Sequence, residues 1–313
     1  MLSLNQNLIP ENPVTRFAPS VTGWLHLGHV AHAAFVWGVA RACGARVVLR
    51  LDDHDRGRFR PEYETSILDD LEWLKFEPDE RYGSRYAQGE YGDRYAAEMT
   101  RLSSRYRTYA CECTRAMIAR YSPQAGSTGE YSGRCRDRGL ACGPGRGVRV
   151  VVEPGVENFT DVLRGELQQD AARGDPLLVD RAGNWTYLMS VVGDDLHEGV
   201  NLVIRGEDLL DSTGRQIRLA RMVGRKAPPV FLHHQLIKDD PGNKLSKREG
   251  ALGVRELRAR GTSPEELLGL AVHSVGLTDE PKPLAADELA GLFGCGADGQ
   301  MGRWADGQVG GRT

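Results

Sequence analysis

The sequence predicts an α/β fold with a parallel sheet, an inserted α+β module and a short helical segment near its end. The first observation behind this prediction is a strand–helix–strand pattern over residues 14–51. The second is a pair of apolar strand patterns, at 201–204 and 230–237, that follows a cysteine-bearing segment. A crossover helix makes its two flanking strands parallel, so we expect a Rossmann-like, nucleotide-binding domain interrupted by the cysteine segment.

The strand–helix–strand pattern has clear boundaries. Residues 14–18 fit the end of a buried strand, and residues 19–23 are rich in turn formers. A helix is predicted from about His26, and Gly44 ends it because glycine readily adopts the left-handed conformation found at helix C-termini. The run 46–51 then has the apolar character of a strand buried on both faces.

Two histidines open the predicted helix. Their spacing of three residues puts His26 and His29 on one face of the first turn, where free N–H groups and the helix dipole favour an anion. Gly28 lies between them and lets a base or ribose approach the backbone. The pair therefore indicates a polyphosphate site. The plainer alternative is that the two histidines lie at a helix N-terminus and bind no ligand. This alternative is favoured for a His-x-x-His pair taken alone.

A second motif lies far downstream in the polar loop that Asp239-Asp240-Pro241-Gly242 opens. It is Lys244-Leu245-Ser246-Lys247-Arg248. Lys244 and Lys247 could follow a triphosphate through its transition state, from a loop able to close over a ligand. A basic loop alone is usually only solvated. Together the two motifs predict a nucleoside-triphosphate site made of His26, Gly28, His29 and Lys247.

The two motifs resemble the signature motifs of class I aminoacyl-tRNA synthetases, and the run Arg16 to Ser20 is similar to that of the glutamate-specific branch. The resemblance covers residues 14 to 275. Within the branch the chain looks most like the short paralogue that attaches glutamate to the queuosine base of tRNA(Asp) and lacks an anticodon-binding region. The reason is length, since only ~60 residues follow the lysine motif.

The resemblance implies a reaction and its residues. ATP, with Mg²⁺, would activate L-glutamate as an adenylate without tRNA, and the adenylate would then acylate the RNA. The catalytic residues would be His26, His29, Lys244 and Lys247.

The resemblance also implies a glutamate pocket. Carboxylates need cations, for which Arg16 and Arg205 are candidates by position, and the ammonium group is assigned to Asp52 and the Tyr187 phenol. The family usually has Glu at the position of Asp52, and Asp reaches about 1 Å less far. The predicted pocket consists of Arg16, Phe17, Ala18, Pro19, Ser20, Asp52, Tyr187 and Arg205.

Three cysteines indicate a metal site. Cys111 and Cys113 are followed by Cys135 on a glycine-bearing turn, and three thiolates with one further ligand would complete a structural zinc site. Such a site would stabilise a module too small for much core. A Cys-x-Cys pair alone is more often an ordinary buried pair. The fourth ligand stays open between Tyr131, which the resemblance favours, and Cys142 in a Pro/Gly turn.

Composition bounds the remaining expectations. The 313 residues carry a net charge of −3, so an RNA partner would have to meet a local basic patch. No apolar run reaches the ~18 residues of a membrane span, and residues 1–7 lack the features of a signal peptide. We expect a cytoplasmic, monomeric protein without a membrane partner.

The predicted division follows these motifs. A strand–turn–strand hairpin is expected over 177–187, a helix over 264–275, a short helix over 285–293 and disorder from about 295. The predicted segments are an N-terminal lead without predicted order (1–13), the first half of the catalytic domain (14–105), the inserted zinc-containing, acceptor-binding module (106–186), the second half with the lysine loop (187–250), a helical segment (251–294) and a Gly-rich tail (295–313).

Three rival functions remain at this stage. A truncated conventional glutamyl-tRNA synthetase would share the site but acylate a tRNA 3′ end. An adenylate-forming ligase of another kind would use a small acceptor. A non-enzymatic RNA-binding protein with a structural zinc would not need the intact histidine and lysine motifs.

Overall fold

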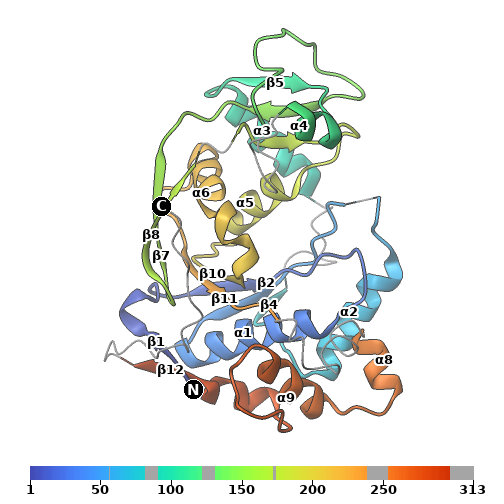
Figure 1. Cartoon of the computed structure of the whole chain (residues 1–313), viewed down its shortest axis with the longest axis vertical. Helices are drawn as coiled ribbons and strands as arrows, with labels where there is room; N and C mark the ends of the chain where they lie inside the picture. Colours follow the sequence, from blue (N-terminus) through green and yellow to red (C-terminus); the bar gives the residue numbers. More distant parts are fainter. Residues whose placement is uncertain (56, 82–90, 122–130, 172–173, 238–252, 297–313) are drawn as a thin grey trace.

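The structure is a computed structural model that describes residues 1–55, 57–81, 91–121, 131–171, 174–237 and 253–296. Figure 1 shows the arrangement of its elements. The strands are β1 Leu2–Asn5, β2 Val14–Phe17, β3 Arg46–Leu49, β4 Glu80–Arg81, β5 Thr108–Cys111, β6 Gly147–Val150, β7 Val156–Asp161, β8 Gly165–Asp170, β9 Leu177–Val179, β10 Leu202–Gly206, β11 Val230–His234 and β12 Phe293–Gly296. The α-helices are α1 Leu27–Cys43, α2 Pro61–Trp73, α3 Gly92–Ser103, α4 Arg115–Tyr121, α5 Tyr187–His197, α6 Thr213–Met222, α8 Val254–Ala259 and α9 Pro264–Ser274. The 3-10 helices are η1 Gln6–Leu8, η4 Glu207–Ser212 and η5 Ala286–Leu292.

The predicted strand–helix–strand unit is confirmed. β2 and β3 pair in parallel, with Val14 opposite Arg46, and β4 extends this sheet. α1 ends at Gly44, whose φ of 68° is the left-handed conformation expected there. The sheet covers one side of α1 and the helices α9 and η5 cover another (Figure 1), which is why most of α1 is buried.

The second half of the parallel sheet structure is built from β10 and β11, which also run parallel. Asn201 joins it to the first half: its N–H donates to the Val14 carbonyl at 3.1 Å, and its Oδ1 accepts the Val14 N–H at 2.7 Å. The carboxyl ends of β2, β3, β10 and β11 therefore meet at one edge, which is where ligands bind in open α/β sheets.

The strands β7 and β8 form a long antiparallel hairpin, at the left of Figure 1. β7 meets β11 through the parallel pair Asp161 and Phe231, so the sheet order is β10-β11-β7-β8. Residues 156–170 lie inside the predicted insertion 106–186, yet their strands extend the sheet of β10 and β11. The division of the chain into units stays a prediction.

The upper part of the molecule in Figure 1 holds the antiparallel sheet β5-β6-β9 with α3 and α4. The predicted hairpin over 177–187 is wrong in its second half. β9 is present, but a single bridge from Val179 to Trp185 replaces the second strand, and α5 begins at Tyr187. The reason is the Thr186 hydroxyl, which accepts the Met189 N–H and caps the helix. This cap favours a helix from Tyr187 more strongly than the strand propensity of the sequence favours a second strand.

The two ends of the described chain pair with each other. β1 and β12 are parallel, with Leu2 opposite Phe293, so the N-terminal lead is ordered. The predicted start of disorder is wrong for Cys295 and Gly296, because pairing with β1 satisfies their backbone groups. The predicted short helix over 285–293 is the 3-10 helix η5, and residues 297–313 lie outside the described residues.

Within the described ranges, every helix falls short of the length and apolar content that a membrane crossing requires.

Candidate functional site

The turn that opens α1 holds the two predicted histidines together. His26 is the N-cap: its Nδ1 accepts the Gly28 N–H at 3.1 Å, and its own N–H donates to His29 Nδ1 at 3.1 Å. The two ring centroids are 3.8 Å apart. Because both Nδ1 atoms accept backbone N–H groups, the proton of each neutral ring sits on Nε2. The turn therefore offers two Nε2–H donors.

Both rings are neutral at pH 7. Burial lowers the pKa of His26, and burial together with neighbouring His26 lowers the pKa of His29 to about 4. A Cβ at Gly28 would lie 3.0 Å from His26 Cε1, so glycine is the residue that leaves this ring in place. The arrangement suits an anion that needs hydrogen bonds at a helix N-terminus.

The described residues on either side of 238–252 lie beside this turn. On one side Gly253 pairs with His26, and the Val254 N–H donates to the Leu25 carbonyl at 2.8 Å. On the other side a Cβ at Gly28 would lie 4.0 Å from Ile237 Cδ1. Lys244 and Lys247 belong to that segment and lie outside the described residues, so their place in the site stays a prediction.

Arg16 lies near the carboxyl end of β2, and its side chain is buried. Its Nε donates to Asp195 at 3.1 Å and its Nη1 to the Ile204 carbonyl at 3.2 Å. Among the described residues its Nη2 has no partner. That nitrogen is available to an anionic ligand.

Arg50, which the sequence did not single out, is the centre of a buried ionic network. It donates to Asp52 at 2.9 Å, to Asp195 at 3.0 Å and to Glu198 at 2.8 Å. Burial raises the pKa of Asp52 and raises that of Glu198 to about 8, although Arg50 opposes both shifts. Burial acts the same way on Asp195, but Arg16 and Arg50 outweigh it and lower the pKa of that carboxyl. The network fixes Asp52 at the edge of the sheet.

Tyr187 is close to three other predicted pocket residues. Burial raises the pKa of its phenol, and the charges of Arg205, Arg16 and Asp52 all act on it. Phe17 differs from these, because its side chain packs in the core against Trp37, with ring centroids 5.2 Å apart.

The remaining predicted pocket residues, Ala18, Pro19 and Ser20, are placed by backbone contacts. Ala18 and Pro19 continue β2 toward the edge, and the Pro19 carbonyl accepts the Asp52 N–H at 3.0 Å. Ser20 is exposed and bridges to Asp52. The structure thus brings Arg16, Ser20, Asp52 and Tyr187 together, with Phe17 pointing away.

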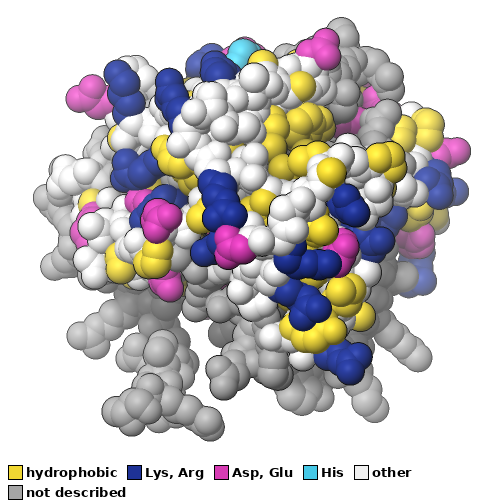
Figure 2. Space-filling view, turned by 90° about the horizontal axis from the view of Figure 1, so that it is seen from above, with side chains coloured by type: hydrophobic (Ala, Val, Ile, Leu, Met, Phe, Trp, Pro, Cys, Tyr) yellow, Lys and Arg dark blue, Asp and Glu magenta, His cyan; other side chains and the backbone are white. Residues whose placement is uncertain are grey.

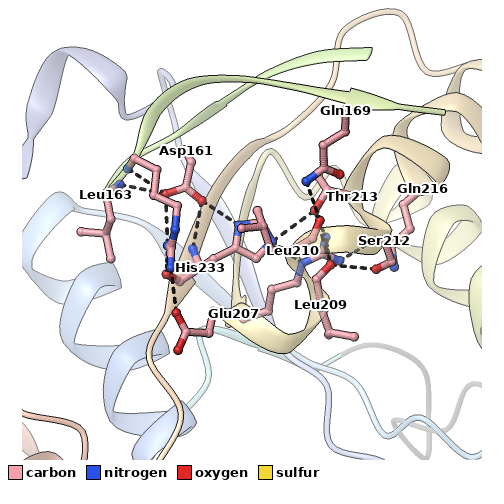
Figure 3. Close-up of polar contacts among 12 residues, drawn as sticks. Asp161, Leu163, Gln169, Glu207, Leu209, Leu210, Ser212, Thr213, Gln216 and His233 are labelled. Atoms are coloured by element: carbon pink, nitrogen blue, oxygen red, sulfur yellow. Dashed lines mark hydrogen bonds and ion pairs between the residues drawn. The ribbon is translucent and has the colours of Figure 1, made fainter. Parts of the chain in front are cut away.

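Arg205 lies at the end of β10, and its hydrogen-bond partners in the described part of the chain are all neutral groups. Its Nε donates to His233 Nε2 at 3.0 Å, its Nη2 to Thr213 Oγ1 at 2.7 Å, and its Nη1 to the Gln216 side-chain oxygen. Figure 3 shows this group of contacts, with Thr213 and Gln216 reaching in from α6. Burial lowers the pKa of Arg205 to about 10, so it remains a cation at neutral pH.

His233 and His234 point to opposite faces of β11, as neighbours on a strand should. His233 contacts Asp161 and Arg205, whereas His234 contacts His32 of α1, with 3.0 Å between His32 Nδ1 and His234 Nε2. This geometry agrees with discounting a metal site made from both.

The three cysteines of the predicted metal site form one cluster. The sulfur atoms of Cys111, Cys113 and Cys135 lie within 4.8 Å of one another, and those of Cys113 and Cys135 are 3.6 Å apart. The Tyr131 hydroxyl accepts the Cys135 N–H at 2.7 Å, which places its oxygen beside the sulfurs. Cys142 is exposed and is not a member of the cluster.

The cluster fits a tetrahedral ion. With Zn–S bonds of about 2.3 Å, two sulfurs on one zinc are about 3.8 Å apart. The sulfurs of Cys113 and Cys135 are 3.6 Å apart, close to this value. All three cysteines and Tyr131 are buried together, as in a closed structural site.

The end of the molecule around this cluster is basic. The described ranges 91–121 and 131–150 contain eleven arginines and four acidic residues, although the whole chain carries a net charge of −3. Figure 2 looks onto this end and shows Lys and Arg side chains spread across it. The exposed arginines are Arg101, Arg105, Arg107, Arg115, Arg120, Arg134 and Arg138.

Residues 13–283 match the family model described as the catalytic domain of class I tRNA synthetases (E and Q). The chain belongs to this family, and it is a ligase of the class I aminoacyl-tRNA synthetase type.

Two of its relatives are named glutamyl-Q tRNA(Asp) synthetase. The one from Symbiobacterium thermophilum is 38% identical over 89% of this chain and 91% of the relative. The one from Rhodobacter capsulatus is 38% identical over 81% of this chain and 98% of the relative.

Longer relatives are also similar. The glutamate–tRNA ligase of Oleidesulfovibrio alaskensis is 36% identical over 94% of this chain, which spans 66% of that protein. The solved structure of a glutamate tRNA ligase from Elizabethkingia meningosepticum, in complex with its amino acid, has a TM-score of 0.71 and 27% identity over 90% of this chain and 64% of its own.

Proposed function

We propose that the protein activates L-glutamate with ATP in the absence of tRNA and transfers the glutamyl group to the queuosine base of tRNA(Asp). The observation that carries the glutamate assignment is Arg205, a buried cation whose hydrogen-bond partners among the described residues are all neutral. Beside it lies Arg16, whose Nη2 has no partner within the same described ranges. One cation with no carboxylate in contact among the described residues, and a second with an unused donor there, suit a substrate that has two carboxylates. The relatives matched over 91% and 98% of their own lengths support the queuosine acceptor by name.

The proposed first step needs no side-chain nucleophile. A glutamate oxygen attacks the α-phosphorus of ATP, and pyrophosphate leaves. The Nε2–H groups of His26 and His29 donate to phosphate oxygens as their charge grows, and Lys244 and Lys247 follow the leaving pyrophosphate. Mg²⁺ enters with ATP. Arg16 and Arg205 bind the carboxylates, and Asp52 with Tyr187 binds the ammonium group.

The proposed second step uses the basic end of the molecule. Its arginines would hold the RNA backbone and present the queuosine base to the adenylate. A nucleophile of that base would attack the glutamyl carbonyl carbon, and AMP would leave. We propose that Cys111, Cys113, Cys135 and Tyr131 hold one structural zinc ion there. The tyrosine is preferred over Cys142 because its hydroxyl already lies within the cluster.

The alternative is a glutamyl-tRNA synthetase that acylates a tRNA 3′ end, and similarity to longer glutamate–tRNA ligases favours it. Two measurements separate the functions. Glutamate-dependent exchange of pyrophosphate into ATP should occur in RNA-free protein, and its absence at saturating substrates would contradict the proposal. Charging should then require tRNA from queuosine-containing cells; equal charging of queuosine-free tRNA would instead support acylation of the 3′ end.

A further inference from the structure

Arg205 is held in an unusual way for a buried cation. Burying an ion is costly unless it is paired, and proteins usually bring a carboxylate into contact. Here the acceptors are an imidazole nitrogen, an amide oxygen, a hydroxyl and the Leu209 carbonyl at 3.4 Å. Among the described residues, no carboxylate forms an ion pair with Arg205. The positive charge is therefore held in place without being neutralised.

The imidazole acceptor depends on a second residue, Asp161 of β7. Asp161 Oδ2 lies 2.6 Å from His233 Nδ1, and its Oδ1 accepts the N–H groups of Leu163 at 3.0 Å and Arg164 at 3.1 Å. A carboxylate that accepts these donors requires a proton on His233 Nδ1. His233 Nε2 then carries the lone pair that Arg205 uses. Figure 3 shows the sequence of contacts from Asp161 through His233 toward α6.

We propose that Asp161, His233 and Gln216 are positioning residues that hold Arg205 through neutral acceptors, so that its charge stays available to a carboxylate of the amino-acid substrate. This inference rests on the proposed function, since it takes glutamate as the substrate. Asp161 fixes the tautomer and orientation of His233 and has Arg164 as its own cationic neighbour, with 3.8 Å between Arg164 Nη1 and Asp161 Oδ1. His233 in turn offers Arg205 a neutral acceptor. A carboxylate in direct contact would stabilise Arg205 equally well but would compete with the ligand.

The variant Gln216→Glu tests this directly. Glutamate at 216 keeps the shape of the side chain and places a carboxylate on Arg205 Nη1. We expect the KM for glutamate in pyrophosphate exchange to rise about 10- to 100-fold, the loss expected for one charge-assisted contact. The KM for ATP should stay unchanged and the melting temperature should stay equal or rise. A residue with only a structural role would not raise one KM while preserving stability.

Gln169→Glu is the matched control. Gln169 also contacts the start of α6, through the Gly214 N–H at 3.0 Å, but does not contact Arg205. The same charge added there should leave the glutamate KM within about 3-fold of wild type.

A second pair of variants decides the matter if Gln216→Glu does not fold. His233→Gln can place an amide oxygen where Nε2 lies, whereas His233→Asn is too short to reach Arg205. We expect a raised glutamate KM in H233N and substantial recovery in H233Q. Equal values in the two variants would overturn the proposal, as would a Q216E protein with a wild-type glutamate KM.

The pH dependence gives an independent readout. Protonation of His233 would turn Nε2 into a donor facing Arg205. The charged groups facing this ring are Asp161 and Arg164 near the end of β7 and Arg205 of β10, while α6 contributes the neutral Thr213. Burial lowers the pKa of His233, so the acceptor is present at neutral pH. The glutamate KM should rise as the pH falls in wild type and stay flat in H233Q; a flat wild-type profile would contradict the role of His233.

Calorimetric titration with glutamate separates this inference from the proposed function. Wild-type protein that binds glutamate but shows no exchange contradicts only the proposed function. Affinity that is the same in wild type and Q216E contradicts only the positioning role, and a wild-type protein that does not bind glutamate contradicts both.

Discussion

His26 and His29 are suited to act as neutral hydrogen-bond donors because of their immediate surroundings. Each Nδ1 accepts a backbone N–H, which leaves the proton on Nε2, and burial keeps both rings uncharged at neutral pH. A neutral donor at a helix N-terminus favours a state in which phosphate charge increases, without adding a buried cation beside the predicted lysines.

Replacing His29 by alanine tests this role. We expect H29A to lower kcat for pyrophosphate exchange by about 10²- to 10³-fold, the loss seen when one preorganised donor is removed. The KM for glutamate should change little, because the ring is proposed to contact ATP. His273→Ala, in α9, serves as a control and should retain exchange. A large rise in glutamate KM with unchanged kcat would assign His29 to the amino acid instead.

The lowered pKa of His29 also predicts how stability depends on pH. The folded-state pKa is about 4 and the ordinary value is 6.5, so between these values the unfolded chain binds a proton that the folded chain does not. Stability should therefore fall as the pH drops from 6.5 toward 4. His234, also lowered to about 4 by burial, contributes in the same direction. Urea denaturation across this range should give a shallower slope in H29A than in wild type.

Local sequence signals predicted some helices and strands, whereas others form only through pairing with distant segments. α1 was predictable because its apolar content and Gly44 are local features. The start of α5 was missed because the cap at Thr186 competes with a strand-like sequence. β12 could not be predicted, since a glycine-rich strand forms only when β1 lies beside it.

Gly38 shows how closely the C-terminal segment packs on α1. A Cβ there would lie 2.2 Å from Phe293 Cε2. We expect Gly38→Ala to destabilise the protein by about 1–3 kcal/mol from overpacking, despite a helix propensity gain of about 1 kcal/mol for alanine. Chemical denaturation measures the difference. Gly291→Ala, where nothing lies within 4 Å of the new Cβ, is the control and should be nearly neutral.

Across the whole molecule, the site is assembled from residues that the sequence separates widely. Arg50 contacts Asp195 and Glu198, 145 and 148 positions away. No local pattern marks such a network, so sequence reasoning could name Arg16 and Arg205 only by their positions and Asp52 only by resemblance. The histidine turn and the cysteine cluster were predictable as groups because the sequence spacing of these residues brings their side chains together.

The buried ionic network and the arginine-rich surface lie in different parts of the molecule. The parallel sheet edge holds the ionic network around Arg50, whereas the cysteine cluster lies at the arginine-rich end. These two regions correspond to the two proposed steps, activation of glutamate and transfer to RNA. Loss of the transfer step need not abolish activation, whereas transfer depends on the adenylate that activation supplies.

Removal of the proposed zinc should therefore uncouple the two steps. Cys135→Ser deletes one buried ligand, and we expect less than one zinc per protein by atomic emission spectroscopy and a lower melting temperature. Pyrophosphate exchange should remain near wild type, because the histidine turn and Arg205 lie on other elements. Transfer of glutamate to tRNA should fall at least about 10-fold, since the arginines lose their supporting framework.

Two further variants identify the fourth ligand in the same assay. Tyr131→Phe removes the hydroxyl that lies in the cluster and should weaken zinc retention against a chelator, while Cys142→Ser should match wild type because Cys142 is exposed. The opposite pattern would assign the ligand to Cys142. Wild-type protein that contains no zinc and transfers glutamate normally would show that the cysteines form an ordinary buried cluster.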